Sequence, residues 1–150
     1  MSLSLGPQTL MLLAIAIPFV AAVLIPLFHR WPNVRDLVTL AAAAILALVV
    51  WTLVGPVLDG ARPERDVLEI VPGFVLAFAI EPLGMLFALV AGSLWLVTSI
   101  YSIGYMRAND EPRQTSYYVC FAVALGATMG VAFAKNLVTL FLFYELLTLS

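Results

Sequence analysis

One carboxylate lies in an otherwise apolar run close to the last residue of the sequence. The run, Asn136–Ser150, reads NLVTLFLFYELLTLS, and Glu145 is its single charged side chain. If Asn136 caps a helix, Glu145 lies nine residues further along, a rise of about 13–14 Å. That depth is close to the midplane of a bilayer, where an ionised acid costs roughly 2.5–3.5 kcal/mol. A cationic partner, internal water or protonation must lower this cost.

Two roles fit such an acid. In the first, Glu145 relays protons or lies on an ion pathway; in the second, it belongs to an ion pair that only fixes helix packing. We favour the first role, because intramembrane ionisable residues are functional by default. The apolar runs hold no lysine, arginine or histidine at a comparable depth. A partner is therefore expected beyond Ser150 or on another subunit.

The composition determines what kind of element carries this acid. The 150 residues are 63% hydrophobic and 11% charged, whereas soluble domains carry about twice that share of charge. Four uncharged stretches are each long enough to span a bilayer. We predict an all-α integral membrane protein with four complete transmembrane helices at about residues 7–28, 37–58, 82–106 and 114–134.

The fifth helix is expected at residues 136–150 and is shorter than the others. Fifteen helical residues rise about 22 Å, less than the roughly 30 Å of the hydrocarbon core. From this geometry we expect residues 1–150 to be the N-terminal part of a longer protein, with the fifth helix truncated. In the fourth helix, small residues recur at every fourth position, which favours tight packing against a neighbouring helix. These are Ala122, Gly126, Gly130 and Ala134.

The largest polar loop, between the second and third helices, contains two short β-prone runs. Val67–Val71 and Phe74–Ile80 flank Pro72-Gly73, a pair that suits the centre of a type II turn. We therefore predict a short β-hairpin at the membrane surface. Glu81-Pro82 then begins the third helix, since proline is harmless in the first turn.

Loop charges indicate the orientation in the membrane. Loops one and three carry one more basic residue than the opposite side, which places them in the cytoplasm and the N-terminus and hairpin outside. The residues counted are Arg30, Arg35, Arg107 and Arg113 against Arg62, Arg65 and Lys135. We expect a multi-pass protein of the inner (plasma) membrane.

Several classes of function find no support in the sequence. The net charge is −2 and the basic residues are scattered, so nucleic-acid binding is not expected. One cysteine and one histidine, Cys120 and His29, make neither a disulfide framework nor a metal or haem site. We predict no cofactor, no metal and no catalytic site in this chain. An enzyme with its own site in the membrane is therefore disfavoured.

Three stretches together resemble the antiporter-like membrane subunits. They are EPLGMLF and YSIGYM at the two ends of the third predicted helix, and NLVTLFLFYELLTLS. This family includes the L, M and N type subunits of respiratory complex I, the A and D type subunits of Mrp cation/proton antiporters, and related hydrogenase subunits. The resemblance implies that Glu145 matches a fifth-helix glutamate that pairs with a lysine on a later helix and lies on the proton path.

The resemblance also implies a function for the whole assembly. We expect proton or cation/proton translocation within a multisubunit membrane complex, of the Mrp antiporter type or the NADH:quinone oxidoreductase or hydrogenase type. The expected partners are other membrane subunits, the lipid bilayer and the remainder of the subunit beyond Ser150. The alternative is a non-transporting structural or assembly subunit, or a truncated fragment. In that case leucine would replace Glu145 with little loss.

Overall fold

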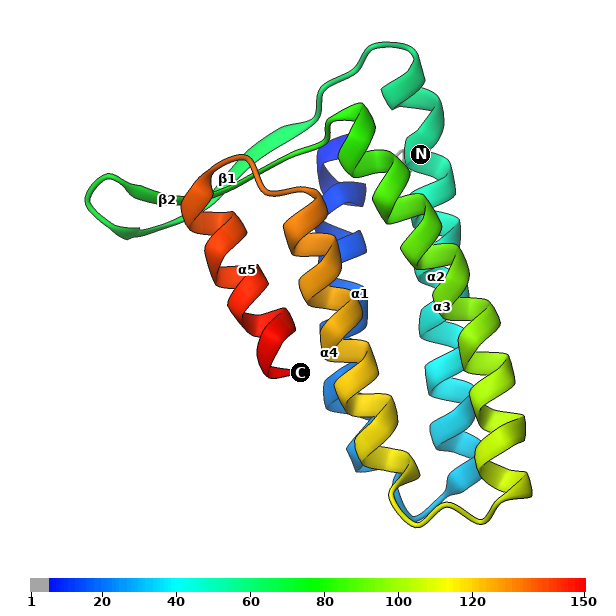
Figure 1. The fold of residues 1–150 in the computed structure, drawn as a ribbon. Helices are drawn as coiled ribbons and strands as arrows, with labels where there is room; N and C mark the ends of the chain where they lie inside the picture. Colours follow the sequence, from blue (N-terminus) through cyan, green and yellow to red (C-terminus); the bar gives the residue numbers. More distant parts are fainter. Residues whose placement is uncertain (1–5) are drawn as a thin grey trace.

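The computed structural model describes residues 6–150, apart from the side chains at positions 70 and 71. Within this range the chain forms five helices and one two-stranded hairpin (Figure 1). Their bounds are α1 Pro7–Leu27, α2 Pro32–Leu58, β1 Glu64–Val71, β2 Phe74–Ala79, α3 Pro82–Ala108, α4 Gln114–Ala132 and α5 Leu137–Leu149. The predicted fold class, with a hairpin between the second and third helices, is confirmed.

The first four helices are long and apolar enough to cross a membrane, and α5 is shorter. Large apolar side chains cover much of the outside of the bundle; Leu27 and Leu48, for example, are about two-thirds exposed, at 68% and 67%. Such a surface is unfavourable in water but matches lipid tails. The chain is a multi-pass membrane protein.

Proline begins three of the helices, at Pro7, Pro32 and Pro82. Its missing N–H is unneeded in the first turn, and its φ angle already suits a helix. For this reason α2 begins at Pro32, and the predicted start at residue 37 is wrong. Arg35 and Asp36 were expected in loop one, but they lie inside α2 and are buried.

The hairpin turns at Pro72-Gly73, as predicted. Gly73 has φ +90°, the left-handed conformation that the third position of a type II turn requires. The strands pair antiparallel, with Glu64 opposite Ala79. The free edge of β2 also bonds the segment between α4 and α5, where Ala79 N–H donates to the Phe133 carbonyl (2.8 Å). The hairpin is thus joined to the segment between α4 and α5 by backbone hydrogen bonds.

The helices pack in a ring in which α1 contacts α2 and α4, and α2 contacts α3 (Figure 1). The α5 helix lies against α4 under the hairpin, and its C-terminal end is about half-way along α4 (Figure 1). The core between α1, α2, α3 and α4 buries Trp95, Tyr118 and Phe133 almost completely.

Candidate functional site

The first turn of α5 is anchored to β2 by two side chains. Asn136 caps the helix, since its Oδ1 accepts a hydrogen bond from Thr139 N–H (2.8 Å), and its Nδ2 donates to the Val75 carbonyl (2.7 Å). Thr139 is fully buried, and its Oγ1 accepts from Ala77 N–H (3.0 Å). The predicted cap at Asn136 is confirmed. These bonds fix where the helix that carries Glu145 begins.

Replacing Thr139 with valine tests this anchor. The substitution keeps the shape but leaves the buried N–H of Ala77 without a partner, so we expect a loss of about 1–3 kcal/mol in the free energy of unfolding. Thr148→Val is the control, because Thr148 is exposed and bonds only the Tyr144 carbonyl of its own helix. Equal unfolding midpoints for the two variants in detergent would refute the anchoring role.

Glycines in α4 determine the rotation of α5 about its axis. The Phe143 ring lies directly on Gly130, where a Cβ atom would overlap it, and Gly126 faces Phe19 of α1 in the same way. Phe143 also contacts Phe19 and Phe78, at centroid distances of 6.4 Å and 5.5 Å. The predicted packing role of the small residues in α4 is therefore confirmed at these two glycines.

We expect Gly130→Ala to displace Phe143 and to destabilise the α4–α5 contact. The Cβ atom meets the root of the ring, which cannot swing away without moving α5, so overpacking costs about 1–3 kcal/mol. Gly104→Ala is the matched control, since no atom lies within 4 Å of its Cβ position. It should be neutral or stabilising by about 0.5–1 kcal/mol. Thermal unfolding in detergent distinguishes the two; equal midpoints would contradict the packing.

Glu145 lies on the opposite side of α5 from Phe143. Each residue turns an α-helix by about 100°, so two residues place the carboxylate on the outer face. There it is exposed, together with Phe141 (62%) and Leu149 (83%). Within residues 6–150 its carboxylate forms no hydrogen bond and no ion pair. The structure thus presents an acid on an apolar outer face of α5.

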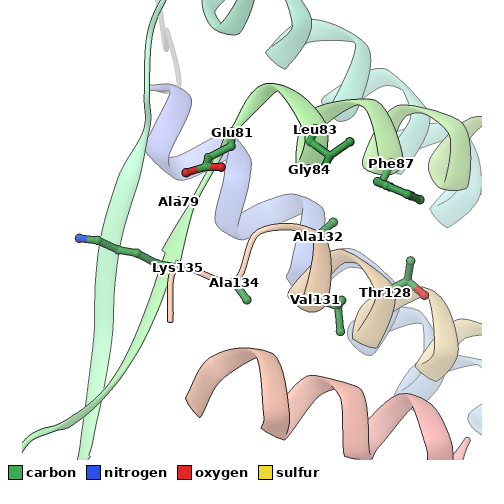
Figure 2. A pocket seen from close by; sticks show the side chains of 10 residues that line it. All are labelled: Ala79, Glu81, Leu83, Gly84, Phe87, Thr128, Val131, Ala132, Ala134 and Lys135. Carbon is green, nitrogen blue, oxygen red and sulfur yellow. The ribbon is translucent and has the colours of Figure 1, made fainter. Parts of the chain in front are cut away.

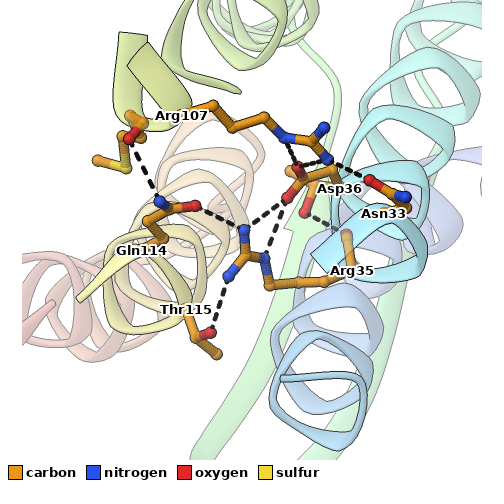
Figure 3. Close-up of polar contacts among 8 residues, drawn as sticks. Asn33, Arg35, Asp36, Arg107, Gln114 and Thr115 are labelled. Atoms are coloured by element: carbon orange, nitrogen blue, oxygen red, sulfur yellow. Dashed lines mark hydrogen bonds and ion pairs between the residues drawn. The ribbon is translucent and has the colours of Figure 1, made fainter. Parts of the chain in front are cut away.

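A second group of charged residues, which the sequence analysis treated as loop residues, joins three helix ends (Figure 3). Arg35 and Arg107 share the buried carboxylate of Asp36. The Arg35 guanidinium donates to Oδ1 from Nε (3.0 Å) and Nη2 (2.8 Å), and Arg107 Nε donates to Oδ2 (2.9 Å). Two cations on one carboxylate leave this group with a net positive charge.

Arg35 extends the charged group from α2 to the start of α4. Its Nη2 donates to Gln114 Oε1 (2.8 Å) and its Nη1 to Thr115 Oγ1 (3.2 Å) (Figure 3). The arrangement was not predicted from the sequence, because charged residues next to an apolar span are typical of loops. The signal was Pro32, which begins α2 one turn before Arg35 and so places Asp36 inside the bundle.

A cleft of about 520 Å³ lies between the start of α3 and the end of α4 (Figure 2). Glu81 and Lys135 line it, but the Lys135 side chain extends toward the hairpin, where its Nζ pairs with Glu64 (3.0 Å) and Asp66 (3.8 Å). The hydrogen bond to Glu64 raises the pKa of Lys135, which keeps this exposed amine protonated. The cleft therefore brings no acid–base pair together.

Histidine, cysteine and carboxylate side chains do not gather into a metal site in the described part of the chain. Among these residues, no three or more lie close enough together to hold an ion. His29 is exposed at the end of the bundle beside the charged group, and its Nδ1 lies 3.2 Å from the Pro26 carbonyl. Cys120 is an exposed free thiol on α4.

Comparison with known proteins finds that the chain is similar to antiporter subunits. The Na(+)/H(+) antiporter subunit A1 of Staphylococcus aureus is 26% identical to it over 147 residues, which is 95% of this chain. The predicted resemblance to antiporter-like membrane subunits is confirmed. Subunits of the same name from strains JH9 and Newman match to the same extent. No family model matches the sequence.

A solved structure supports the fold. A chain of the membrane-bound sulfane sulfur reductase, an archaeal respiratory membrane complex, superimposes with a TM-score of 0.76 over 91% of this chain, at 20% identity. The present chain spans only 18% of the length of the curated relative and 21% of the solved chain. The matched region is therefore most of this chain but a small part of each larger protein.

Proposed function

We propose that this chain contributes to a cation/proton-translocating membrane complex and that Glu145 lies on its proton path. The observation that carries the proposal is the position of Glu145 on α5: an acid without a partner among residues 6–150, on an apolar outer face. The relatives are named as Na(+)/H(+) antiporter subunits, which supports the choice of transported ions.

A mechanism follows from the electrostatics of an acid near the middle of a bilayer. In a medium of low dielectric constant, a carboxyl group without a cation keeps its proton, and an approaching cation favours the ionised form. A lysine that moves toward Glu145 would therefore release the proton, and a lysine that moves away would allow proton uptake. In this proposal the lysine comes from outside residues 6–150.

The rigid attachment of α5 suits this role. Phe143 fixes its rotation against Gly130, and Thr139 fixes its first turn against β2. An acid held in one place responds to the charge of its partner without first moving itself, which lowers the cost of ordering the site. The exposed ring of Phe141 and side chain of Leu149 would pack around the partner helix and exclude lipid.

The expected partners are other membrane subunits of one complex in the inner (plasma) membrane. The N-terminus and the hairpin would lie outside, and the ends joined by Asp36 would face the cytoplasm. The Mrp type differs from the complex I or hydrogenase type in what drives proton movement, an ion gradient in the first and electron transfer in the second. Each class of assembly would use the same intramembrane acid.

Proton flux in sealed vesicles tests the proposal. Vesicles with the assembled complex would be compared for wild type and Glu145→Gln, with sodium gradients applied in either direction. The proposal requires a sodium-driven or electron-transfer-driven pH change that disappears in the variant. If the variant assembles and transports like wild type, the alternative applies and the chain is a structural subunit.

A further inference from the structure

A line of polar side chains follows the buried face of α3 into the centre of the bundle. Trp95, Ser99 and Ser102 recur at helical spacing, and their exposed fractions are 1%, 2% and 5%. Gly92, one turn before Trp95, faces side chains of both α2 and α4, which shows what this face of α3 packs against. The line lies between three transmembrane helices and not toward lipid.

Three buried polar atoms of α3 and α4 lack a hydrogen-bond partner in the described part of the chain. They are Trp95 Nε1, Ser99 Oγ and, on α4, the hydroxyl of Tyr118. The neighbouring Ser102 differs, since its Oγ lies 3.1 Å from the Tyr117 hydroxyl. Buried polar groups in proteins nearly always have a protein or water partner.

Ser99 differs from two threonines inside the other helices of the bundle. Hydroxyls inside membrane helices commonly bond the carbonyl four residues earlier. Thr39 does so to the Arg35 carbonyl (3.0 Å) and Thr128 to the Ala124 carbonyl (2.8 Å). The same carbonyl position is available to Ser99 on Trp95, yet no bond forms. Its hydroxyl is therefore left for another partner.

The line of polar groups begins beside a polar crevice at one end of the bundle. This crevice, of about 520 Å³, is lined by Arg35, Arg107, Gln114 and other polar residues. The Arg35 guanidinium lies over the Tyr118 ring, 5.1 Å from its centroid. From Arg107 to Trp95 the helix rises about 18 Å, which brings Trp95 to the middle of α3.

We propose that water enters from this crevice and occupies a site between α2, α3 and α4, where it hydrogen-bonds Tyr118, Ser99 and Trp95. Internal water typically makes about three hydrogen bonds to groups that are otherwise unsatisfied. The site requires neither Glu145 nor any transported ion. It opens at the end of the bundle opposite to the hairpin and reaches the middle of the membrane.

Cysteine accessibility tests the proposal in the complete complex, in membranes and without any transport readout. Ser99→Cys and Ile100→Cys would be made in a background that lacks Cys120 and other free cysteines, and treated with a charged methanethiosulfonate. Only a thiolate reacts, and a thiolate forms only where water is present. Ile100 is at the same depth but 60% exposed on the outer face, so it reports a lipid-facing thiol.

We expect Ser99→Cys to react at least about tenfold faster than Ile100→Cys. Equal or slower reaction of Ser99→Cys would overturn the proposal. X-ray hydroxyl-radical labelling of the unmodified protein in lipid nanodiscs gives a second measurement, which does not depend on the folding of a variant. Bound water should make Trp95 oxidise faster than Trp51, which is 59% exposed on the outside of the bundle. Slower oxidation of Trp95 than of Trp51 would overturn the proposal as well.

Discussion

Glu145→Gln should reduce proton flux by about 100-fold or more while the complex still assembles. Proton-transferring side chains contribute about 10²–10⁴-fold to the rates of the steps they serve. Glutamine keeps the length and most of the hydrogen-bonding capacity of glutamate, but its amide does not take up or release a proton near neutral pH. Because the side chain is on the outer face of α5 and makes no bond within residues 6–150, the fold of these residues should not change.

The measurement is the rate of pH change inside sealed vesicles, normalised to the amount of assembled complex. Glu111→Gln serves as a matched control, since Glu111 is an exposed carboxylate in the loop between α3 and α4. It should leave the flux unchanged. Glu145→Asp, which retains the titrating group one methylene shorter, should keep part of the flux. Full flux in Glu145→Gln would exclude the proposed role of this residue.

Asp36→Asn should destabilise the protein by about 3–5 kcal/mol. Removing one member of a buried ion pair leaves the other charge buried without compensation. Here the remaining charge is the Arg35 guanidinium, whose side chain is only 5% exposed. The neutral amide of asparagine cannot offset the guanidinium charge, even though it retains the shape. The contacts that join α2 to α3 and α4 should weaken together, because the Asp36 carboxylate pairs with both Arg35 and Arg107.

Thermal unfolding in detergent measures the loss of stability in Asp36→Asn. Two further variants test whether this loss is specific to the buried carboxylate. Arg107→Gln should cost at most about 1 kcal/mol, because the Arg107 side chain is 46% exposed and its ion pair is partly screened. Glu111→Gln, an exposed acid near the same end of the bundle, should change the unfolding midpoint very little. An Asp36→Asn variant as stable as wild type would show that Asp36 does not hold this end together.

Hydropathy and local turn chemistry predicted much of the fold. Long uncharged runs predicted the four spans because a helix must cover the hydrocarbon core with apolar side chains. Pro72-Gly73 predicted the hairpin because glycine alone tolerates the left-handed position of that turn easily. Asn136 predicted the start of α5 because its side chain satisfies a free N–H of the first turn. Each of these features depends on residues close together in the sequence.

The start of α2 at Pro32 was not predicted from the sequence. Charged residues near a span resemble a loop when hydropathy is the criterion, so Arg35 and Asp36 were assigned to loop one. Inside the bundle they neutralise each other and meet Arg107, which lies far away in the sequence. A hydropathy profile cannot show that these charges compensate one another, because the ion pair with Arg107 forms only when α2 and α3 pack side by side.

The sequence by itself determined that this is a membrane chain, that a hairpin precedes the third span and that one acid lies in the apolar run of α5. The tertiary structure decided which way that acid points. The ring of Phe143 lies directly on Gly130, and this contact turns Glu145 outward. Tertiary packing also left Ser99 and Trp95 in the core without hydrogen-bond partners among the described residues. Rotation and pairing of this kind depend on side chains from different helices, and no local pattern encodes them.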